Sequence, residues 1–250
     1  MSAEKTEAVV IRTVDFSETS SIVTFFTRDF GKLSTLAKGA RRKKSPFESA
    51  LDLLARCRIV FLHKSNDSLD LLTEAKLANR LRASEVELPR LYACFYIAEL
   101  LLNLTDELDP HPDLFDVTIE SLRQIEDPAV NYEPVILRYE LTTLRETGHL
   151  PSLDKCVGCG REIQPQTRVS FGLLAGGVLC SQCRAGHRRL LSIRTGILEV
   201  LKEFSDPKSS TSRSHQAYFD AQKEIRPVMN SYIAELLGKK PKLSRFLPIL

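Results

Sequence analysis

The spacing of hydrophobic and polar positions changes once along the chain, near residue 78. Before that point, apolar residues fall into short runs rich in β-branched and aromatic side chains, each bounded by polar turn residues, which is typical of β-strands. The connections are too short for βαβ crossovers, so the runs predict a small antiparallel barrel, and an SH3-like barrel would give the same pattern. Five strands are predicted, over residues 7–14, 21–26, 33–37, 53–62 and 69–73. Residues 64–68 are predicted as a turn, and residues 46–51 as a short helix.

After residue 78, apolar residues recur at the spacing of a helix. Residues 91–105 are apolar at nearly every position of one face and predict a well-buried helix. Gly148 is suited to end a later helix as its C-cap. Four further helices are predicted, over residues 114–125, 134–147, 190–204 and 217–237, with a polar loop at 205–214. The pattern therefore predicts a barrel followed by a helical body.

Composition and charge fit a soluble globular protein. The chain is 43% hydrophobic and 27% charged, and it holds no apolar run of the ~18–20 residues that span a bilayer. The first residues are polar and lack the apolar stretch of a signal peptide, so a cytoplasmic protein without membrane partners is expected. Net charge is +4 over residues 1–80, −9 over 81–155 and +8 over 156–250, which indicates separate partner surfaces. Charge kept for solubility would explain the same counts.

Four of the six cysteines form the pattern C-x2-C-x20-C-x2-C, as CVGC and CSQC. Each pair places two thiolates at one tight turn, and two such turns supply the tetrahedral sulfur set that zinc favours. The predicted ligands of a structural Zn²⁺ are Cys156, Cys159, Cys180 and Cys183. Residues 168–174 and 178–179 are predicted as the two strands of the hairpin between the pairs. The sequence thus predicts a zinc ribbon over residues 152–190, set inside the helical body.

The four cysteines are compatible with other kinds of site. A catalytic zinc needs an open position, which four cysteines do not leave, and a redox pair would be expected as one CxxC near a βαβ unit. An iron–sulfur cluster also takes four cysteines and stays open as an alternative. His187 could replace a ligand, although a surface role is favoured, and Cys57 and Cys94 sit among apolar neighbours typical of a core. Nearby cations could offset the −2 charge of the site: Lys155, Arg161, Arg184, Arg188 and Arg189.

A basic segment, residues 38–44 (KGARRKK), follows the third predicted strand. Clustered cations displace counterions from a polyanion, so the segment indicates nucleic-acid binding, while a solvated loop is the plainer explanation. Phe16 and Phe47 fall in predicted loops and could stack on bases. The predicted contacts are Lys38, Arg41, Arg42, Lys43 and Lys44, extended by Lys32, Arg56 and Arg58, with Lys64 and Arg12 as further candidates.

Motifs of common enzymes do not occur in the sequence. We find no G-x-x-x-x-G-K-[ST], G-x-G-x-x-G, H-E-x-x-H, G-x-S-x-G or deaminase-type H-x-E pattern, so we expect no catalytic residues and no enzyme. One acidic cluster could bind a divalent cation, although helix caps and a solvated face explain it more simply. It consists of Asp106, Glu107, Asp109, Asp113 and Asp116.

Three stretches give the chain a resemblance to the RecO family of bacterial recombination mediators. They are EAVVIRTVDFSETSSIVTFFT, FGKLSTLAKGARRKKS and the embedded cysteine pattern, and the ending KLSRFL adds to them. The resemblance implies an α+β multidomain protein: an OB-fold barrel over residues 1–78, a helical domain over 79–250, and the zinc ribbon within it. Some members of the family lack the cysteines, which implies that the zinc is structural.

The same resemblance implies a function. Proteins of this family bind single- and double-stranded DNA without sequence preference, anneal complementary strands and, with RecR, help RecA replace single-strand-binding protein (SSB). Residues 38–44 would then contact DNA on the nucleoid. We add the hypothesis that Arg184, Arg188 and Arg189 hold a second strand. An RNA-binding accessory factor and a metal-dependent hydrolase that uses the acidic cluster are the competing functions.

Overall fold

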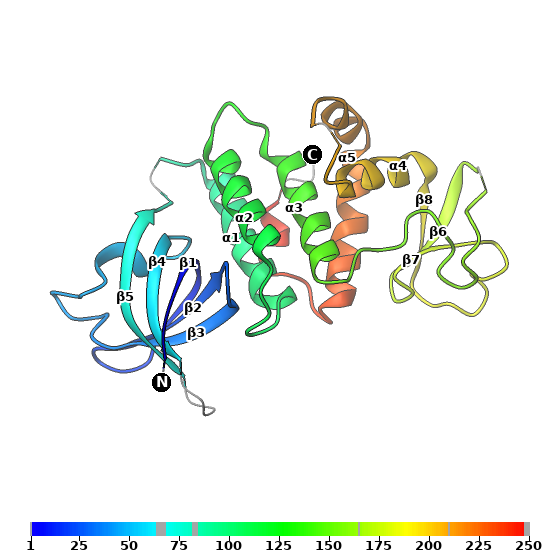
Figure 1. Ribbon diagram of the computed structural model, residues 1–250. Helices are drawn as coiled ribbons and strands as arrows, with labels where there is room; N and C mark the ends of the chain where they lie inside the picture. The colour runs from blue at the N-terminus through cyan, green and yellow to red at the C-terminus, as the bar shows by residue number, and fades with distance from the viewer. Residues whose placement is uncertain (1, 64–68, 82–84, 165, 210, 248–250) are drawn as a thin grey trace. The chain divides into compact units, whose positions relative to one another are not determined.

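The computed structural model describes residues 2–63, 69–81, 85–164, 166–209 and 211–247 (Figure 1). The turn expected at 64–68, with Lys64, lies outside the described residues. The chain forms two compact units, Met1–Val130 and Asn131–Leu250, and each is described by itself. The boundary between the units does not fall at residue 78, because two helices pack with the barrel; the domain division expected there stays a prediction.

Five strands of the first unit close into a barrel (blue to cyan in Figure 1). Around the barrel the order is β1-β2-β3-β5-β4, and neighbouring strands are antiparallel except for the parallel pair β3 and β5. This order in a closed five-stranded barrel confirms the expected OB-like fold. The strands are β1 (Ser2–Asp15), β2 (Ser21–Thr27), β3 (Gly31–Ala37), β4 (Arg56–His63) and β5 (Asp70–Asn79).

The barrel interior is filled by alternate residues of its strands. In β3, buried and half-buried positions alternate along all seven residues, as expected of a strand with one face in the core. Phe47, from the connection between β3 and β4, also lies in this core and is 3% exposed. A base could not reach its ring, so the expectation that Phe47 stacks on bases is wrong.

The fourth strand begins later than its apolar run predicts. Leu54 has a φ of +66°, and its N–H donates to the carbonyl of Val10 at 2.8 Å. The N–H of Val10 in turn donates to the carbonyl of Ala55 at 3.1 Å. These bonds hold a tight turn against β1, so β4 starts only at Arg56. A short 3-10 helix, Glu48–Leu51, precedes the turn, within the predicted helical segment.

Two helices, α1 (Leu88–Leu104) and α2 (Pro112–Glu126), complete the first unit. The rings of Phe26 and Phe115 lie 6.1 Å apart and join β2 to α2. The ammonium of Lys32 donates to the carbonyls of Leu102, at 3.0 Å, and of Thr105, at the C-terminal end of α1. Because carbonyls there lack partners within the helix, this lysine acts as a cap that ties β3 to α1.

The second unit combines helices with a three-stranded sheet of order β7-β6-β8. Its elements are α3 (Tyr132–Glu146), β6 (Arg168–Gly172), β7 (Gly177–Leu179), β8 (Leu190–Arg194), α4 (Thr195–Ser205), α5 (Thr211–Leu236) and the 3-10 helix η2 (Ser244–Phe246). The expected hairpin of β6 and β7 is present. The helix expected over residues 190–204 is wrong in its first part, because Leu190–Arg194 pairs with β6 as a strand. Within the described ranges, no helix has both the length and the apolar character needed to cross a membrane.

Candidate metal centre and nucleic-acid interface

The four paired cysteines come together at the end of the β6–β7–β8 sheet. All four sulfur atoms lie within 4.8 Å of one another, and the Cys159 and Cys180 sulfurs are 3.9 Å apart. Backbone amides point at the sulfurs, since the N–H of Cys180 donates to Cys156 Sγ at 3.3 Å and that of Cys183 to Cys180 Sγ at 3.4 Å. In the part of the chain that the structure describes, this is the one group of His, Cys, Asp or Glu side chains arranged to hold a metal ion.

Two glycines, Gly158 and Gly160, allow the backbone of the first cysteine pair to form its turn. A β-carbon added at Gly158 would lie 2.9 Å from the β-carbon of Cys183, so the two turns approach each other too closely for any other residue there. Gly160 has a φ of +72°, a conformation that glycine adopts without strain. The turn Cys156–Gly160 is closed by a hydrogen bond from Gly160 N to the carbonyl of Cys156 at 2.8 Å.

The sulfurs interact with one of the cations expected to offset their charge. Arg161 donates from Nε to Cys159 Sγ at 3.3 Å, and this bond lowers the pKa of Cys159 to about 6. Hydrogen bonds with the sulfurs of Cys180 and Cys159 raise the pKa of Cys183 to about 12. Because the thiolate is the form that binds a metal, binding of an ion to these sulfurs would release protons.

The remaining cations near the cysteines do not contact the sulfurs. Arg184 and Arg188 are exposed, and Arg189 forms an ion pair with Glu235 of α5. His187 is exposed and is not part of the sulfur cluster.

Cys57 and Cys94 lie in the core of the first unit, as their apolar neighbours indicate. Both are 0% exposed, and burial raises the pKa of each thiol to about 12. Because the thiolate is the reactive form, both side chains are inert at neutral pH.

The basic segment, residues 38–44, begins directly after β3. Its five cationic side chains, Lys38, Arg41, Arg42, Lys43 and Lys44, are all exposed. Gly39 has a φ of +79°, and its carbonyl accepts a hydrogen bond from Arg42 N at 3.1 Å, so the segment starts with a tight turn. The structure thus brings these five predicted contacts together on one loop of the barrel.

Arg41 differs from the other four cations because it forms hydrogen bonds and an ion pair with the end of β1 and the β1–β2 loop. Its Nη1 donates to the carbonyl of Ser17 at 2.8 Å, and its Nη2 lies 3.2 Å from a carboxylate oxygen of Asp15. Its backbone N–H donates to the carbonyl of Thr19 at 3.2 Å. The basic segment and the β1–β2 loop therefore form one connected surface.

Lys32, Arg56 and Arg58 lie elsewhere on the barrel. Lys32 caps α1 from the end of β3 opposite the basic segment, and burial lowers the pKa of its ammonium. Arg56 and Arg58 share one partner, since their nitrogens lie 2.8 Å and 3.7 Å from the carboxylate of Glu7. Their role as nucleic-acid contacts stays a prediction.

Three acidic residues of the α1–α2 connection and the start of α2 are engaged in contacts. Asp116 pairs with Arg28 of the barrel, Asp109 lies 3.1 Å from the ring of His111, and Glu107 accepts a hydrogen bond from Ser34 at 3.5 Å. Two of these contacts, those of Asp116 and Glu107, link the helical part of the unit to the barrel.

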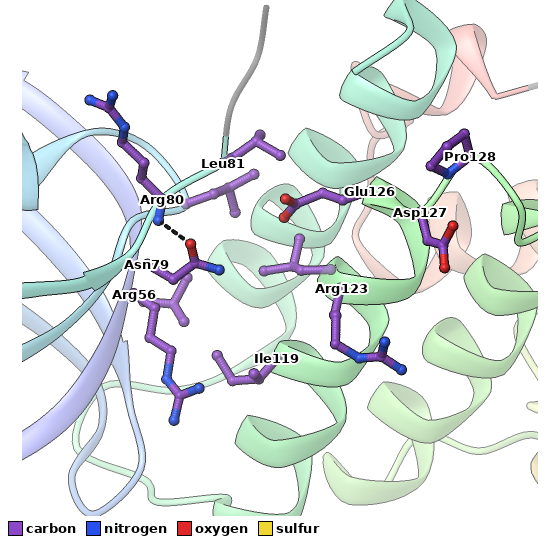
Figure 2. A pocket seen from close by; sticks show the side chains of 12 residues that line it. Arg56, Asn79, Arg80, Leu81, Ile119, Arg123, Glu126, Asp127 and Pro128 are labelled. Carbon is purple, nitrogen blue, oxygen red and sulfur yellow. Dashed lines mark hydrogen bonds between the residues drawn. The ribbon is translucent and has the colours of Figure 1, made fainter. Parts of the chain in front are cut away.

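A groove of 510 Å³ lies between the barrel and α2 (Figure 2). Arg56 comes from β4 and Arg80 directly follows β5, whereas Ile119 and Arg123 come from α2. Sequence reasoning missed this groove because its walls are about 40 to 120 residues apart along the chain, and no periodicity links them.

Comparison with known families covers almost the whole chain. Residues 1–81 match the family described as "Recombination protein O N terminal", and residues 86–245 match "Recombination protein O C terminal". A "DNA repair protein RecO" of Rhodopirellula baltica is 40% identical over 264 aligned positions, which cover 96% of this chain and 97% of the relative. Relatives of the same description from Symbiobacterium thermophilum and Anaeromyxobacter dehalogenans are each 30% identical; the alignments cover 100% and 99% of this chain, and 98% and 96% of the relatives. A barrel of OB-like order, a helical second unit with a cysteine cluster, and these matches agree: the chain belongs to the RecO family of DNA repair proteins.

Proposed function

We propose that this chain is a non-enzymatic recombination mediator that binds single- and double-stranded DNA and anneals complementary strands. Together with RecR it would help RecA load onto DNA covered by SSB, on the nucleoid in the cytoplasm. The observation that carries the proposal is the basic segment, which presents five exposed cations on one loop of an OB-like barrel in a RecO-family chain.

Charge neutralisation is the physical basis of this activity. Among the described residues, no carboxylate forms an ion pair with Lys38, Arg42, Lys43 or Lys44, so their charge is available to a polyanion. Each phosphate neutralised releases counterions, and the salt dependence of binding grows by roughly 0.9 per phosphate for duplex and ~0.7 for single strands. Such contacts ignore base sequence, which suits a protein that pairs arbitrary complementary strands.

Zinc is the ion that the cysteine cluster fits best. Two thiolates bound at ~2.3 Å in a tetrahedral site are about 3.8 Å apart. The sulfurs of Cys159 and Cys180 already lie 3.9 Å apart, and all four lie within 4.8 Å of one another. An iron–sulfur cluster would spread the four sulfurs over several irons, and it fits less well. Bound zinc would join the two cysteine turns and stabilise them.

Arg184 and Arg188 are proposed as a second DNA surface during annealing. Both are exposed beside the cysteine turns, whereas Arg189 pairs with Glu235. Charge reversal of Arg184 and Arg188 should lower the rate of annealing more than the affinity for a single strand. Equal losses of both, or no loss, would contradict a second surface.

The test of the main proposal is charge reversal in the basic segment. A variant with Arg42→Glu and Lys43→Glu should bind all DNA sequences more weakly, with a salt slope lower by roughly 1.4 for single strands. The matched control, Lys239→Glu with Lys240→Glu, makes the same change in net charge at two exposed lysines of the second unit. Affinity and annealing would be measured on oligonucleotides with and without an SSB coat, and unchanged binding of the first variant would refute the proposed interface. A strong preference for RNA would favour the RNA-binding alternative.

A further inference from the structure

Phe16 is the exposed aromatic ring of the barrel. It is 60% exposed, whereas the other phenylalanines of the described barrel strands and loops are buried or half-buried. Those rings are Phe25, Phe26, Phe47 and Phe61, each at most 3% exposed, and Phe30, which packs edge-on against Phe61. Core packing accounts for these five rings and leaves the position of Phe16 unexplained.

The loop that carries Phe16 is held in one conformation by its own hydrogen bonds. The N–H groups of Phe16 and Ser17 both donate to the carbonyl of Ser20, at 3.0 Å and 3.1 Å. The N–H of Ser20 donates to the hydroxyl of Ser17 at 3.2 Å. A ring presented on such a closed loop loses little conformational entropy when a ligand orders it.

Arg41 contacts this loop on both sides of Phe16. Its guanidinium contacts Asp15, the residue before Phe16, and the carbonyl of Ser17, the residue after it. The bonds from Arg41 hold the residues on either side of the exposed Phe16 against the basic segment. The surface therefore offers cations for phosphates and, next to them, an aromatic face for a base.

We infer that Phe16 stacks on an unpaired base of a DNA strand whose phosphates lie on the basic segment, and that Arg41 is the positioning residue for this contact. The inference rests on the proposed function and deepens it. In a duplex each base is already stacked and paired, so Phe16 gains nothing there. The ring thus gives the barrel a preference for single strands that cations alone do not supply.

Replacement of the ring tests the stacking. Phe16→Ala should weaken binding to a single-stranded oligonucleotide by roughly 5- to 150-fold, leave duplex affinity unchanged, and keep the salt slope. Val14→Ala is the matched control, because Val14 is 41% exposed on the adjoining end of β1. Equal loss of single-strand and duplex binding, or no loss of either, would overturn the inference.

A fluorescent variant tests the contact directly. The chain has no tryptophan, so Phe16→Trp introduces a single indole at the proposed position. Stacking on a base should quench its emission on addition of single strands and not of duplex, with single-strand affinity kept or increased. Bound single strands without quenching would contradict stacking.

Arg41→Gln, made in the Phe16→Trp background, tests the positioning role. We expect the quench to shrink and the preference for single strands over duplex to fall, with little change in the salt slope on duplex. A slope that falls by about 0.9 on duplex, with the quench intact, would make Arg41 a phosphate contact instead. Failure of the stacking alone leaves the charge reversals of the basic segment effective on both kinds of DNA, whereas failure of the proposed function abolishes their effect too.

Discussion

Glu140 of α3 and Arg226 of α5 form an ion pair from which water is excluded. Their side chains are 0% and 4% exposed. Two charges in the interior of the second unit are tolerated because they neutralise each other. The pair therefore fixes how α3 and α5 pack within that unit.

Loss of one member of this pair should destabilise the second unit strongly. We expect Glu140→Leu to lower the free energy of unfolding by about 3–5 kcal/mol, because it leaves the Arg226 charge buried without its carboxylate. The double variant Glu140→Leu with Arg226→Met should recover most of this loss. Urea denaturation of the zinc-loaded protein measures both, and a single variant within about 0.5 kcal/mol of wild type would contradict the prediction.

Arg90 should be a second determinant of stability, in the first unit. Its guanidinium donates to four backbone carbonyls at the end of α2 and in the turn that follows, those of Ile125, Asp127, Pro128 and Val130, at 2.9–3.3 Å. Arg90→Ala should lower the free energy of unfolding by roughly 1.5–3 kcal/mol, the usual range for hydrogen bonds from a charged donor. Arg123→Ala is the control. Arg123 pairs with Glu120 on the exposed surface of α2, so its loss should change the stability little. Equal losses in thermal unfolding would contradict this role for Arg90.

Sequence patterns predict those features that depend on residues close together in the chain. The alternation of residues 33–37 predicts a strand, and the C-x2-C spacing predicts a turn with two sulfurs; both are present. Residues 190–194 were predicted as helix because their apolar run continues into α4. They form a strand only because β6, about twenty residues earlier, offers them an edge.

Contacts between distant loops could not be predicted in this way. The five cations of residues 38–44 look equivalent in the sequence, yet Arg41 reaches back 24 residues to Ser17. Likewise, Phe16 and Phe47 both fall in predicted loops, and the packing of the β3–β4 connection alone buries Phe47. The charge of the candidate interface was therefore predictable, and its division into contact and positioning residues was not.

Glu7 should make barrel stability depend on pH. The hydrogen bond from Arg56 lowers the pKa of Glu7 below its ordinary value of 4.5. A carboxyl with a lowered folded-state pKa stabilises the fold fully above its unfolded-state pKa, and this contribution is lost as the pH falls through the folded-state value. Glu7→Gln should thus be less stable than wild type at pH 7, and the difference should disappear in strong acid. Glu18→Gln, at an exposed loop position, should show no such trend, and a Glu7→Gln difference that persists in acid would contradict the prediction.

The six cysteines should fall into two groups by reactivity: the four clustered cysteines, and the two buried ones, Cys57 and Cys94. A disulfide reagent attacks thiolates, and zinc would protect the four clustered sulfurs in the loaded protein. Removal of zinc with a chelator should expose those four, while Cys57 and Cys94 stay unreactive, because burial raises the pKa of both to about 12. Only denaturant should release the last two. Six reactive thiols before unfolding would instead show that the core around Cys57 and Cys94 is open to solvent.

Cys180→Ala should lower both the zinc content and the thermal stability of the second unit, and full stability in that variant would refute a structural role for the site.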